Sequence, residues 1–259
     1  MIGIFDSGVG GMTVARAVER FLPGYPILYL GDIARTPYGT KSAATIIEYS
    51  RGNVRFLIEQ GATLIVIACN TASSVATMAL RREFPLPIFE VISPAVAEAA
   101  GASKNGRIGV IGTSATVRSA MYEKLLHEAR PDCRVWQKAC PLLVPLAEEG
   151  WLNRQESKMI IRRYLHPLKN RQIDTLVLGC THYPLFAPLI QPRIGKRVRL
   201  IDSSLAVAAF LHKTFNEQAD LAAGLKTGGQ SRFFVTDRTE SVQRIAEMIF
   251  RRPMELELV

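Results

Sequence analysis

Two cysteines stand in nearly repeated segments of this chain of 259 residues. Cys69 follows the apolar run Ile65-Val-Ile-Ala, and Cys180 follows Leu176-Val-Leu-Gly. Such runs are typical of strands buried on both faces, and open α/β sheets bind ligands beyond the carboxyl ends of their strands. A single buried cysteine is as often inert, because a free thiol packs like a small apolar group. The matched contexts favour two thiols that face one cleft.

Polar residues that favour a helix start follow each cysteine: Asn70, Thr71 and Ser73 after the first, Thr181 and Pro184 after the second. A helix N-terminus stabilises a thiolate, which lowers the thiol pKa from its usual value of about 8.5. We therefore expect part of each thiol to be ionised at neutral pH. A thiolate can act as a nucleophile, a metal ligand or a base.

These three roles require different neighbours. A cysteine hydrolase needs one nucleophile and one base, which Cys180 and His182 could supply, but the second thiol would have no part. Asp6 could join both cysteines and His182 around zinc, although the short paired spacings of zinc motifs are absent. A redox pair more often has the C-x-x-C spacing. Acid-base catalysis from two opposed faces uses both thiols and is the pattern of a racemase.

A glycine-rich turn follows the first expected strand, in Phe5-Asp-Ser-Gly-Val-Gly-Gly11. Backbone amides in such a turn, at the start of a helix, can bind a carboxylate or a phosphate. The spacing matches neither a Walker loop nor a dinucleotide-binding fingerprint, and a tight structural turn is an equally good interpretation. Asp6 either caps the following helix or acts in a site.

The composition indicates a globular protein, with 48% hydrophobic residues. Its four cysteines include no C-x-x-C pair, and the N-terminus has no signal-peptide pattern, so we expect a cytoplasmic protein with reduced thiols. No apolar stretch approaches the roughly 20 residues of a membrane helix, and we expect no membrane partner.

The net charge of +9 raises the question of nucleic acid. Basic clusters such as Arg162-Arg163 and Arg251-Arg252 are short and lack the interleaved aromatic residues that stack on bases. This distribution argues against a nucleic-acid partner. The positive field suits a small anionic substrate instead, while a non-enzymatic role in binding a nucleic-acid enzyme stays open.

Short apolar runs alternate with amphipathic segments, which predicts βαβ units around parallel sheets. The expected strands are 2–5, 27–30, 64–68, 88–91, 108–111, 175–178, 198–201 and 233–235. The expected helices are 12–21, 43–60, 73–83, 117–128, 155–165, 205–215 and 240–250. We expect 216–231 to be a surface loop.

A second correspondence links Ile2-Gly-Ile-Phe-Asp-Ser7 with Ile108-Gly-Val-Ile-Gly-Thr113, and each precedes one cysteine segment. The fold class we expect is therefore α/β with two pseudo-symmetric lobes, each a mainly parallel sheet flanked by helices. The first lobe would contain residues 1–93 and 206–259, and the second 94–205. The active site would lie in the cleft between them.

Nearly the whole chain resembles the cofactor-independent glutamate racemases of the aspartate/glutamate racemase superfamily. The resemblance rests on the order and spacing of the glycine turn and of Gly31-Asp-Ile-Ala-Arg-Thr-Pro-Tyr-Gly39, Ala68-Cys-Asn-Thr-Ala-Ser73, Cys140-Pro-Leu-Leu-Val-Pro-Leu-Ala-Glu-Glu-Gly150, Leu178-Gly-Cys-Thr-His-Tyr-Pro184, Asp202-Ser-Ser204 and Thr236-Asp237.

This resemblance implies an isomerase that interconverts L- and D-glutamate and supplies D-glutamate for peptidoglycan, and hence for the cell wall and cell shape. It implies that Cys69 and Cys180 are the two bases, that Asp6 assists Cys69, and that His182 and Glu148 stand beside Cys180. Substrate contacts would come from Asp6, Ser7, Tyr38, Gly39, Asn70, Thr71, Thr113, Thr116, Thr181 and His182. It further implies a homodimer that uses no cofactor and no metal. Aspartate is the alternative substrate, and Glu149 could replace Glu148.

Overall fold

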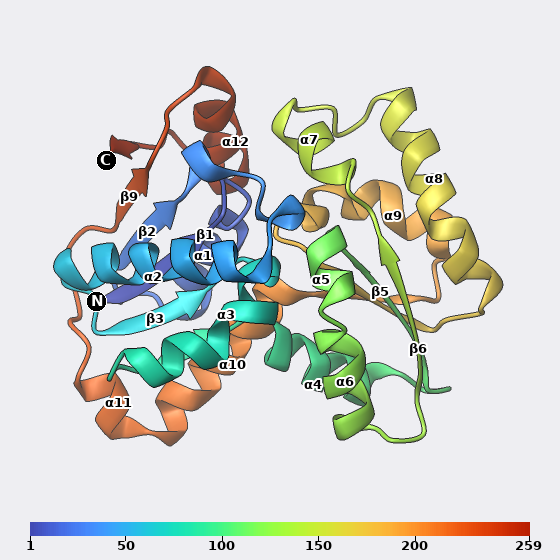
Figure 1. Ribbon diagram of the computed structural model, residues 1–259, viewed down its shortest axis with the longest axis horizontal. Coiled ribbons are helices and arrows are strands. Elements are labelled where there is room, and N and C mark those ends of the chain that lie inside the picture. The colour runs from blue at the N-terminus through green and yellow to red at the C-terminus, as the bar shows by residue number, and fades with distance from the viewer.

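The computed structural model describes residues 1–259 and contains two sheets whose strands are all parallel (Figure 1). The first sheet has the order β10-β9-β2-β1-β3-β4, with β1 Ile2–Asp6, β2 Ile27–Gly31, β3 Leu64–Ile67, β4 Ile88–Glu90, β9 Arg232–Val235 and β10 Glu257–Leu258. The second has the order β6-β5-β7-β8, with β5 Arg107–Gly112, β6 Arg134–Ala139, β7 Thr175–Gly179 and β8 Arg199–Asp202. The expected α/β class with two mainly parallel sheets is confirmed.

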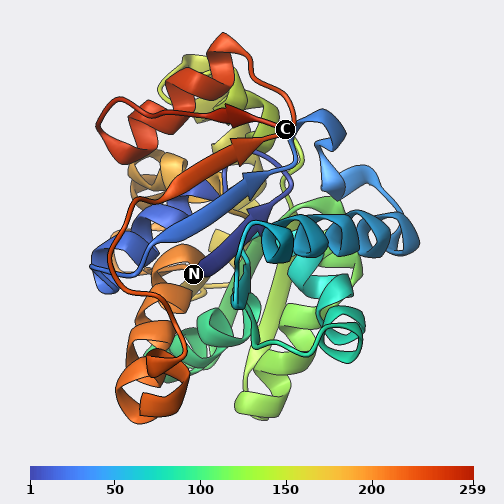
Figure 2. The ribbon, with the colours of Figure 1, turned by 90° about the vertical axis from the view of Figure 1, so that its left-hand side faces the viewer.

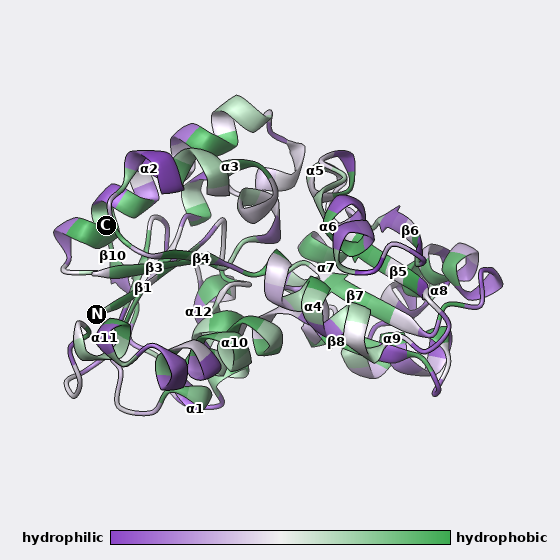
Figure 3. Cartoon of the chain, turned by 90° about the horizontal axis from the view of Figure 1, so that it is seen from below, coloured by the Kyte–Doolittle hydropathy of each residue, from purple (hydrophilic) through white to green (hydrophobic).

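Helices cover both faces of each sheet, as Figure 3 shows for α2 and α3 on one side of the first sheet and α1, α10 and α12 on the other. Their bounds are α1 Met12–Phe21, α2 Ala43–Glu59, α3 Asn70–Glu83, α4 Ile92–Ala102, α5 Ser114–Arg118, α6 Met121–Ala129, α7 Leu143–Glu148, α8 Gln155–Asn170, α9 Ala187–Ile194, α10 Ser203–Glu217, α11 Ala219–Ala223 and α12 Glu240–Phe250. Three short 3-10 turns complete the fold: η1 Ile33–Arg35, η2 Tyr38–Thr40 and η3 Tyr183–Phe186.

Matched glycines explain part of the sequence repeat. A Cβ atom at Gly3 in β1 would lie 2.8 Å from Cβ of Ala62, and one at Gly109 in β5 would lie 2.6 Å from Cδ1 of Ile173. Both distances are below van der Waals contact, so each first strand lacks a side chain where another segment packs against it. The same packing requirement therefore recurs in the two sheets.

The C-terminal segment returns to the first sheet. β9 pairs with β2 and β10 pairs with β9, and Figure 2 shows these strands beside the N-terminal strands. The strands of the second sheet all come from residues between 107 and 202. The bounds of the two lobes, 1–93 with 206–259 and 94–205, stay a prediction.

Several elements differ from the sequence-based expectation. The expected helix 117–128 is two helices, because Ala120 takes a left-handed conformation (φ 52°) between α5 and α6. The expected loop 216–231 contains the short helix α11. Strands β6 and β10 and helices α4, α7 and α9 were not predicted. β6 is a partly exposed edge strand of mixed polarity, so no apolar run marks it in the sequence. No helix has both the length and the apolar character needed to cross a membrane.

Candidate active site

A small closed cavity lies where β3 and β7 end. Both Cys69 and Cys180 line it, so the two sheets each contribute one thiol. Its other lining residues are Ser7, Thr36, Pro37, Tyr38, Gly39, Asn70, Thr71, Thr113, Val144, Thr181 and His182. Of the residues singled out from the sequence, Asp6, Thr116 and Glu148 lie behind this lining and contact it. Thr36, Pro37 and Val144 were not singled out.

The cavity measures about 20 Å³. One water molecule needs about 10–15 Å³ by the same measure. Glutamate has ten heavy atoms, so this arrangement is closed around the site. Admission of an amino acid requires the walls to move apart.

Cys69 caps helix α3. Its Sγ accepts a hydrogen bond from the Ala72 amide at 3.5 Å and donates to Ser7 Oγ at 3.4 Å. Burial and the nearby charge of Asp6 raise its pKa to about 12, although the bonds with Ser7 and Ala72 oppose the shift. The expectation that the helix start leaves this thiol partly ionised is therefore wrong. In the closed cavity, desolvation outweighs the helix N-terminus.

Asp6 ends β1 and is fully buried. Its carboxylate accepts hydrogen bonds from the Gly8 amide at 2.9 Å and from Thr181 Oγ1 at 3.3 Å. Burial raises its pKa to about 6, against the opposing effects of His182 and these hydrogen bonds. Asp6 therefore carries a negative charge at neutral pH, and its bond to Thr181 joins the two sheets.

The glycine turn serves protein side chains. A Cβ atom at Gly10 would lie 2.5 Å from the His182 ring, and one at Gly11 would lie 2.2 Å from Cβ of Asp6. With the Gly8 amide, the turn binds the carboxylate of Asp6 within the same chain. The anion that this turn binds in the structure is thus an internal one, and the close packing of its glycines agrees with the tight structural turn that was the other interpretation.

Cys180 has different neighbours. Its Sγ lies 4.0 Å from Nδ1 of His182, whose Nε2 lies 3.4 Å from Oε1 of Glu148. Nε2 has no partner of hydrogen-bond geometry, so the contact with Glu148 is an ion pair. Burial lowers the pKa of His182, but Cys180 and Glu148 outweigh it and raise the value to about 10. The imidazole is therefore charged at neutral pH.

The helix expected after Cys180 is only the 3-10 turn η3, which starts at Tyr183. Glu148 is the last residue of α7 and is partly buried, whereas Glu149 is exposed. Ser241 at the start of α12 donates a hydrogen bond to the Glu148 carbonyl. The carboxylate that faces His182 is thus that of Glu148.

Three threonine hydroxyls, from the start of α3 after β3 and from the start of α5 after β5, form a cluster. Oγ1 of Thr71 lies 2.9 Å from that of Thr113 and 3.3 Å from that of Thr116, and the last two are 3.0 Å apart. Hydroxyl hydrogens can rotate, so the cluster can redirect donors toward a carboxylate. Thr116 does not line the cavity itself, so it can affect a bound carboxylate only through its contacts with Thr71 and Thr113.

Tyr122 on α6 was missed from the sequence. Its hydroxyl donates to Oδ1 of Asn70 at 2.6 Å, and the Asn70 amide donates to Ser203 at 3.2 Å. A Cβ atom at Gly179 would lie 3.0 Å from the Tyr122 ring. This buried side chain therefore contacts the residue after Cys69 and the residue before Cys180. An aromatic residue in an amphipathic helix carries no sequence signal beyond core packing.

Asp32 holds the turn that contains Tyr38 and Gly39. The Tyr38 hydroxyl donates to this buried carboxylate, which also accepts from Arg35 at 2.8 Å and Thr236 at 3.3 Å. Because this hydroxyl is engaged, the turn can offer a ligand its backbone and the face of the Tyr38 ring. The sequence motif contained Asp32, but nothing in the pattern assigned it this position.

The zinc alternative finds no support in the geometry, since no three side chains of His, Cys, Asp or Glu are grouped so that they could hold a metal ion. All four cysteines are free thiols. The arrangement is therefore two thiols at one cavity, one beside a carboxylate and one beside an imidazolium.

Comparisons with known proteins identify the family of this chain. The family model described as Asp/Glu/Hydantoin racemase matches residues 12–211. The glutamate racemase of Persephonella marina is 44% identical over 256 residues, which span 99% of this chain and 95% of that protein.

Solved structures give the same result. Glutamate racemase from Bacillus anthracis superposes with a TM-score of 0.92 at 38% identity, covering 100% of this chain and 97% of that one. The Francisella tularensis enzyme, solved in complex with D-glutamate, gives a TM-score of 0.90 at 36% identity, covering 100% and 96%. The chain is an amino-acid racemase and belongs to the glutamate racemase family.

Proposed function

We propose that this protein interconverts L- and D-glutamate by proton transfer between two cysteines, without a cofactor or metal, and so supplies D-glutamate for peptidoglycan. The observation that carries the proposal is the cavity that Cys69 and Cys180 share at the ends of β3 and β7. Two bases on separate sheets can approach the two faces of one α-carbon.

The reaction moves one proton in each step. One thiolate accepts the α-proton as the C–H bond breaks, and the thiol on the other face gives its proton to the α-carbon. His182 is positively charged at neutral pH and lies 4.0 Å from Cys180 Sγ, while the raised pKa of Cys69 favours a neutral thiol. When Cys180 removes the α-proton, the Cys69 thiol is therefore the acid that gives a proton to the other face.

Negative charge develops at the α-carbon and spreads to the adjacent carboxylate, so donors must be aimed at that group in a site with little water. The threonine cluster and the amides that follow Cys69 and Cys180 can supply such donors. The remaining contacts in the proposal come from Ser7, Gly39, Asn70, Thr181 and His182. Exclusion of water strengthens each of these interactions.

The test follows the circular dichroism of purified protein with L-glutamate, in the presence of a metal chelator and without pyridoxal phosphate. Decay of the signal to zero is expected. A flat trace with L-glutamate and decay with L-aspartate would show that the substrate is aspartate instead of glutamate. A flat trace with both would overturn the proposal, and activity that chelator abolishes would overturn the metal-free mechanism.

The homodimer and the cytoplasmic location stay predictions. Sedimentation at micromolar protein concentration tests the first, because a dimer has twice the mass of the 28.6 kDa chain. Cell fractionation tests the second.

A further inference from the structure

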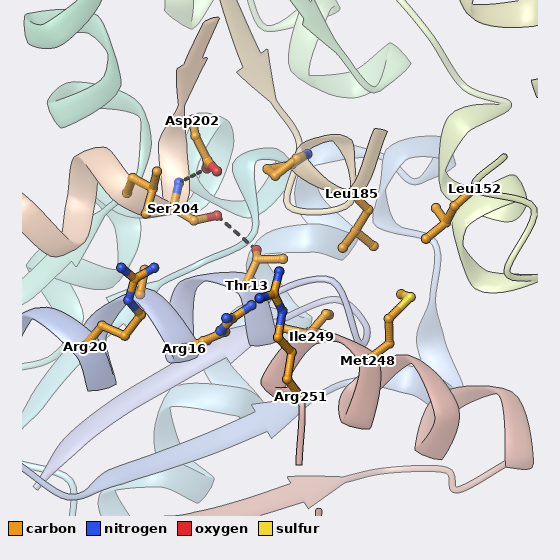
Figure 4. Close-up of a pocket in the computed structure, with 13 residues that line it drawn as sticks. Thr13, Arg16, Arg20, Leu152, Leu185, Asp202, Ser204, Met248, Ile249 and Arg251 are labelled. Atoms are coloured by element: carbon orange, nitrogen blue, oxygen red, sulfur yellow. Dashed lines mark hydrogen bonds between the residues drawn. The ribbon is translucent and has the colours of Figure 1, made fainter. Parts of the chain in front are cut away.

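A second cavity lies outside the catalytic one, between α1, the end of α12 and the segment that follows β7 (Figure 4). It measures about 390 Å³, far more than the catalytic cavity. Small-molecule sites commonly measure about 300–1,000 Å³ and often lie between domains. This cavity is therefore large enough for a ligand and lies where such ligands bind.

Three arginines line it. Arg16 and Arg20 stand one turn apart on α1, and Arg251 follows the last residue of α12. None of the three forms an ion pair or a side-chain hydrogen bond, whereas Glu19 on the same helix pairs with Arg252 at 2.7 Å. Like charges four residues apart on a helix, as in Arg16 and Arg20, repel each other, and Arg20 and Arg251 are exposed to solvent.

Arg16 is partly buried and lies near the other two arginines. Burial and then the charges of Arg251 and Arg20 lower its pKa, and the charge of Glu19 opposes them. Arg251 ends α12 with a left-handed backbone (φ 57°), a common conformation at the C-terminus of a helix. In Figure 4 the guanidinium groups of Arg16 and Arg251 lie close together below Thr13. Two positive groups are thus next to each other at the cavity, between Arg20 and the apolar side chains.

A single carboxylate, that of Asp202, lines the cavity, and it caps α10 by accepting from the Ser204 amide at 2.8 Å. Its charge is partly satisfied by this helix start. The cavity therefore has a positive excess. Guanidinium groups match phosphate oxygens in bidentate geometry, and a phosphate carries a charge of about −1.5 to −2 near pH 7.

Apolar side chains form the other end of the cavity. Leu152, Leu185 and Met248 face it from three different elements in Figure 4, and Met248 is 39% exposed. An inorganic ion would leave this surface in contact with water. A ligand with an apolar group next to its anion would cover it.

We propose that this cavity binds a small phosphate ester, with its phosphate on Arg16 and Arg251 and its apolar group against Leu185 and Met248. The two parts of the site make separate contributions. The arginines determine affinity for any phosphate, and the apolar end determines the preference for an ester over the inorganic ion. This site does not depend on the proposed function of the catalytic cavity.

Titration calorimetry with phenyl phosphate and with inorganic phosphate tests the site on the intact protein. We expect phenyl phosphate to bind more tightly, and Arg16→Gln and Arg251→Gln each to weaken both ligands by roughly tenfold or more, the effect of losing a charged hydrogen bond. Met248→Ser should weaken phenyl phosphate by roughly threefold to tenfold and leave inorganic phosphate unchanged.

Arg244→Gln is the matched control, because Arg244 lies on α12, forms no ion pair and lines a different cavity. It should leave both affinities unchanged. If Arg244→Gln weakened binding as much as Arg16→Gln and Arg251→Gln do, the net charge of the protein alone would explain the binding of phosphate, and the proposed site would be overturned. The site would also be overturned if neither ligand bound at millimolar concentration, or if Met248→Ser kept the preference for phenyl phosphate over inorganic phosphate unchanged. Unchanged far-UV spectra of the variants show that each is folded.

Discussion

The ends of β3 and β7 present the same residue in opposite electrostatic surroundings. Cys69 lies near the Asp6 carboxylate and has a pKa raised to about 12 by burial, whereas Cys180 lies 4.0 Å from the imidazole of His182. Asp6 ends β1, the strand next to β3, whereas His182 follows Cys180 by two residues where the first segment has Thr71. The surroundings of each thiol therefore come from residues on its own side of the cavity.

This difference suits a reaction that needs a base and an acid at once. Burial favours a neutral thiol at Cys69, the form that can donate a proton, whereas the residue beside Cys180 is the charged imidazole of His182. The two thiols therefore have unequal surroundings in the protein itself.

The largest expected effect is the loss of activity when either thiol is removed by substitution. Cys69→Ala and Cys180→Ala should each lower kcat for glutamate by roughly 10²–10⁴-fold, the usual contribution of a general acid or base. Each change replaces a small buried group with a smaller one, so the fold should persist. Circular dichroism follows both racemisation and folding. Cys133→Ala is the matched control, since that thiol is buried outside the cavity, and comparable loss there would contradict the assignment.

The second-largest expected effect concerns the charged residues that assist each thiol, Asp6 beside Cys69 and His182 beside Cys180. Asp6→Asn should slow proton transfer at Cys69, and His182→Asn should slow it at Cys180, each by roughly tenfold or more for a charged hydrogen bond. Because L- and D-glutamate have equal free energies in water, kcat/KM falls equally in both directions. Rates alone cannot distinguish the two sides.

Isotope effects can distinguish them. With α-deuterated substrate, slower transfer at one thiol increases the isotope effect on kcat/KM for the enantiomer that this thiol deprotonates. It decreases the effect for the other enantiomer. Asp6→Asn and His182→Asn should therefore increase the effect for opposite enantiomers. An increase for the same enantiomer in both variants would overturn the division of roles.

Stability should respond to the same two residues in opposite directions. Burial raises the pKa of Asp6 from 3.8 to about 6, so the folded protein holds this proton more tightly than the unfolded chain. The resulting stability is present below pH 3.8 and is lost as the pH rises through about 6. At pH 8, Asp6→Asn should raise the free energy of unfolding by on the order of 2 kcal/mol.

His182 behaves in the opposite way at the same pH. Its pKa is raised from 6.5 to about 10, so the charged form stabilises the fold below 6.5 and this contribution is lost as the pH rises through about 10. At pH 8, His182→Asn should therefore destabilise by a similar amount. Urea unfolding measures both. The stability gained by Asp6→Asn should decrease toward pH 4, and the stability lost in His182→Asn should decrease toward pH 10. Changes in the free energy of unfolding that had the same sign at pH 8 would contradict both assignments.

The sequence predicts the parallel strands well, because β1, β3, β5 and β7 are buried on both faces and appear as continuous apolar runs. It predicts edge strands poorly. β6 is half exposed and β10 has two residues, so neither leaves a periodic pattern. Ala120 divides one amphipathic stretch by its left-handed conformation, and an alanine gives no signal for that.

The candidate site was predictable where the residues adjoin a strand end. Ten of the residues expected to act in the site line the catalytic cavity: Ser7, Tyr38, Gly39, Cys69, Asn70, Thr71, Thr113, Cys180, Thr181 and His182. The ionisation of the thiols was not predictable. The pKa of Cys69 depends on burial and on Asp6, which the local helix start does not reveal. Contacts across the cleft, such as that of Tyr122 with Asn70, need the tertiary structure.

The smallest expected effect tests whether the two thiols are held in a fixed relation. Tyr122→Phe removes the 2.6 Å hydrogen bond to Asn70 and leaves the ring against Gly179. The loss of one hydrogen bond should lower the free energy of unfolding by about 1 kcal/mol. Because Asn70 follows Cys69 and Gly179 precedes Cys180, we expect kcat to fall more than the affinity for glutamate.

Asn70→Ala provides the partner for a double-mutant cycle. If the hydroxyl acts through Asn70, the double variant should lose less kcat than the sum of the two single effects, expressed as free energies. Tyr164→Phe is the control, because Tyr164 lies on α8 and does not line the catalytic cavity. Additive effects in the cycle would mean that Tyr122 only fills space. A coupling would show that Tyr122, which does not line the catalytic cavity, acts on kcat through Asn70.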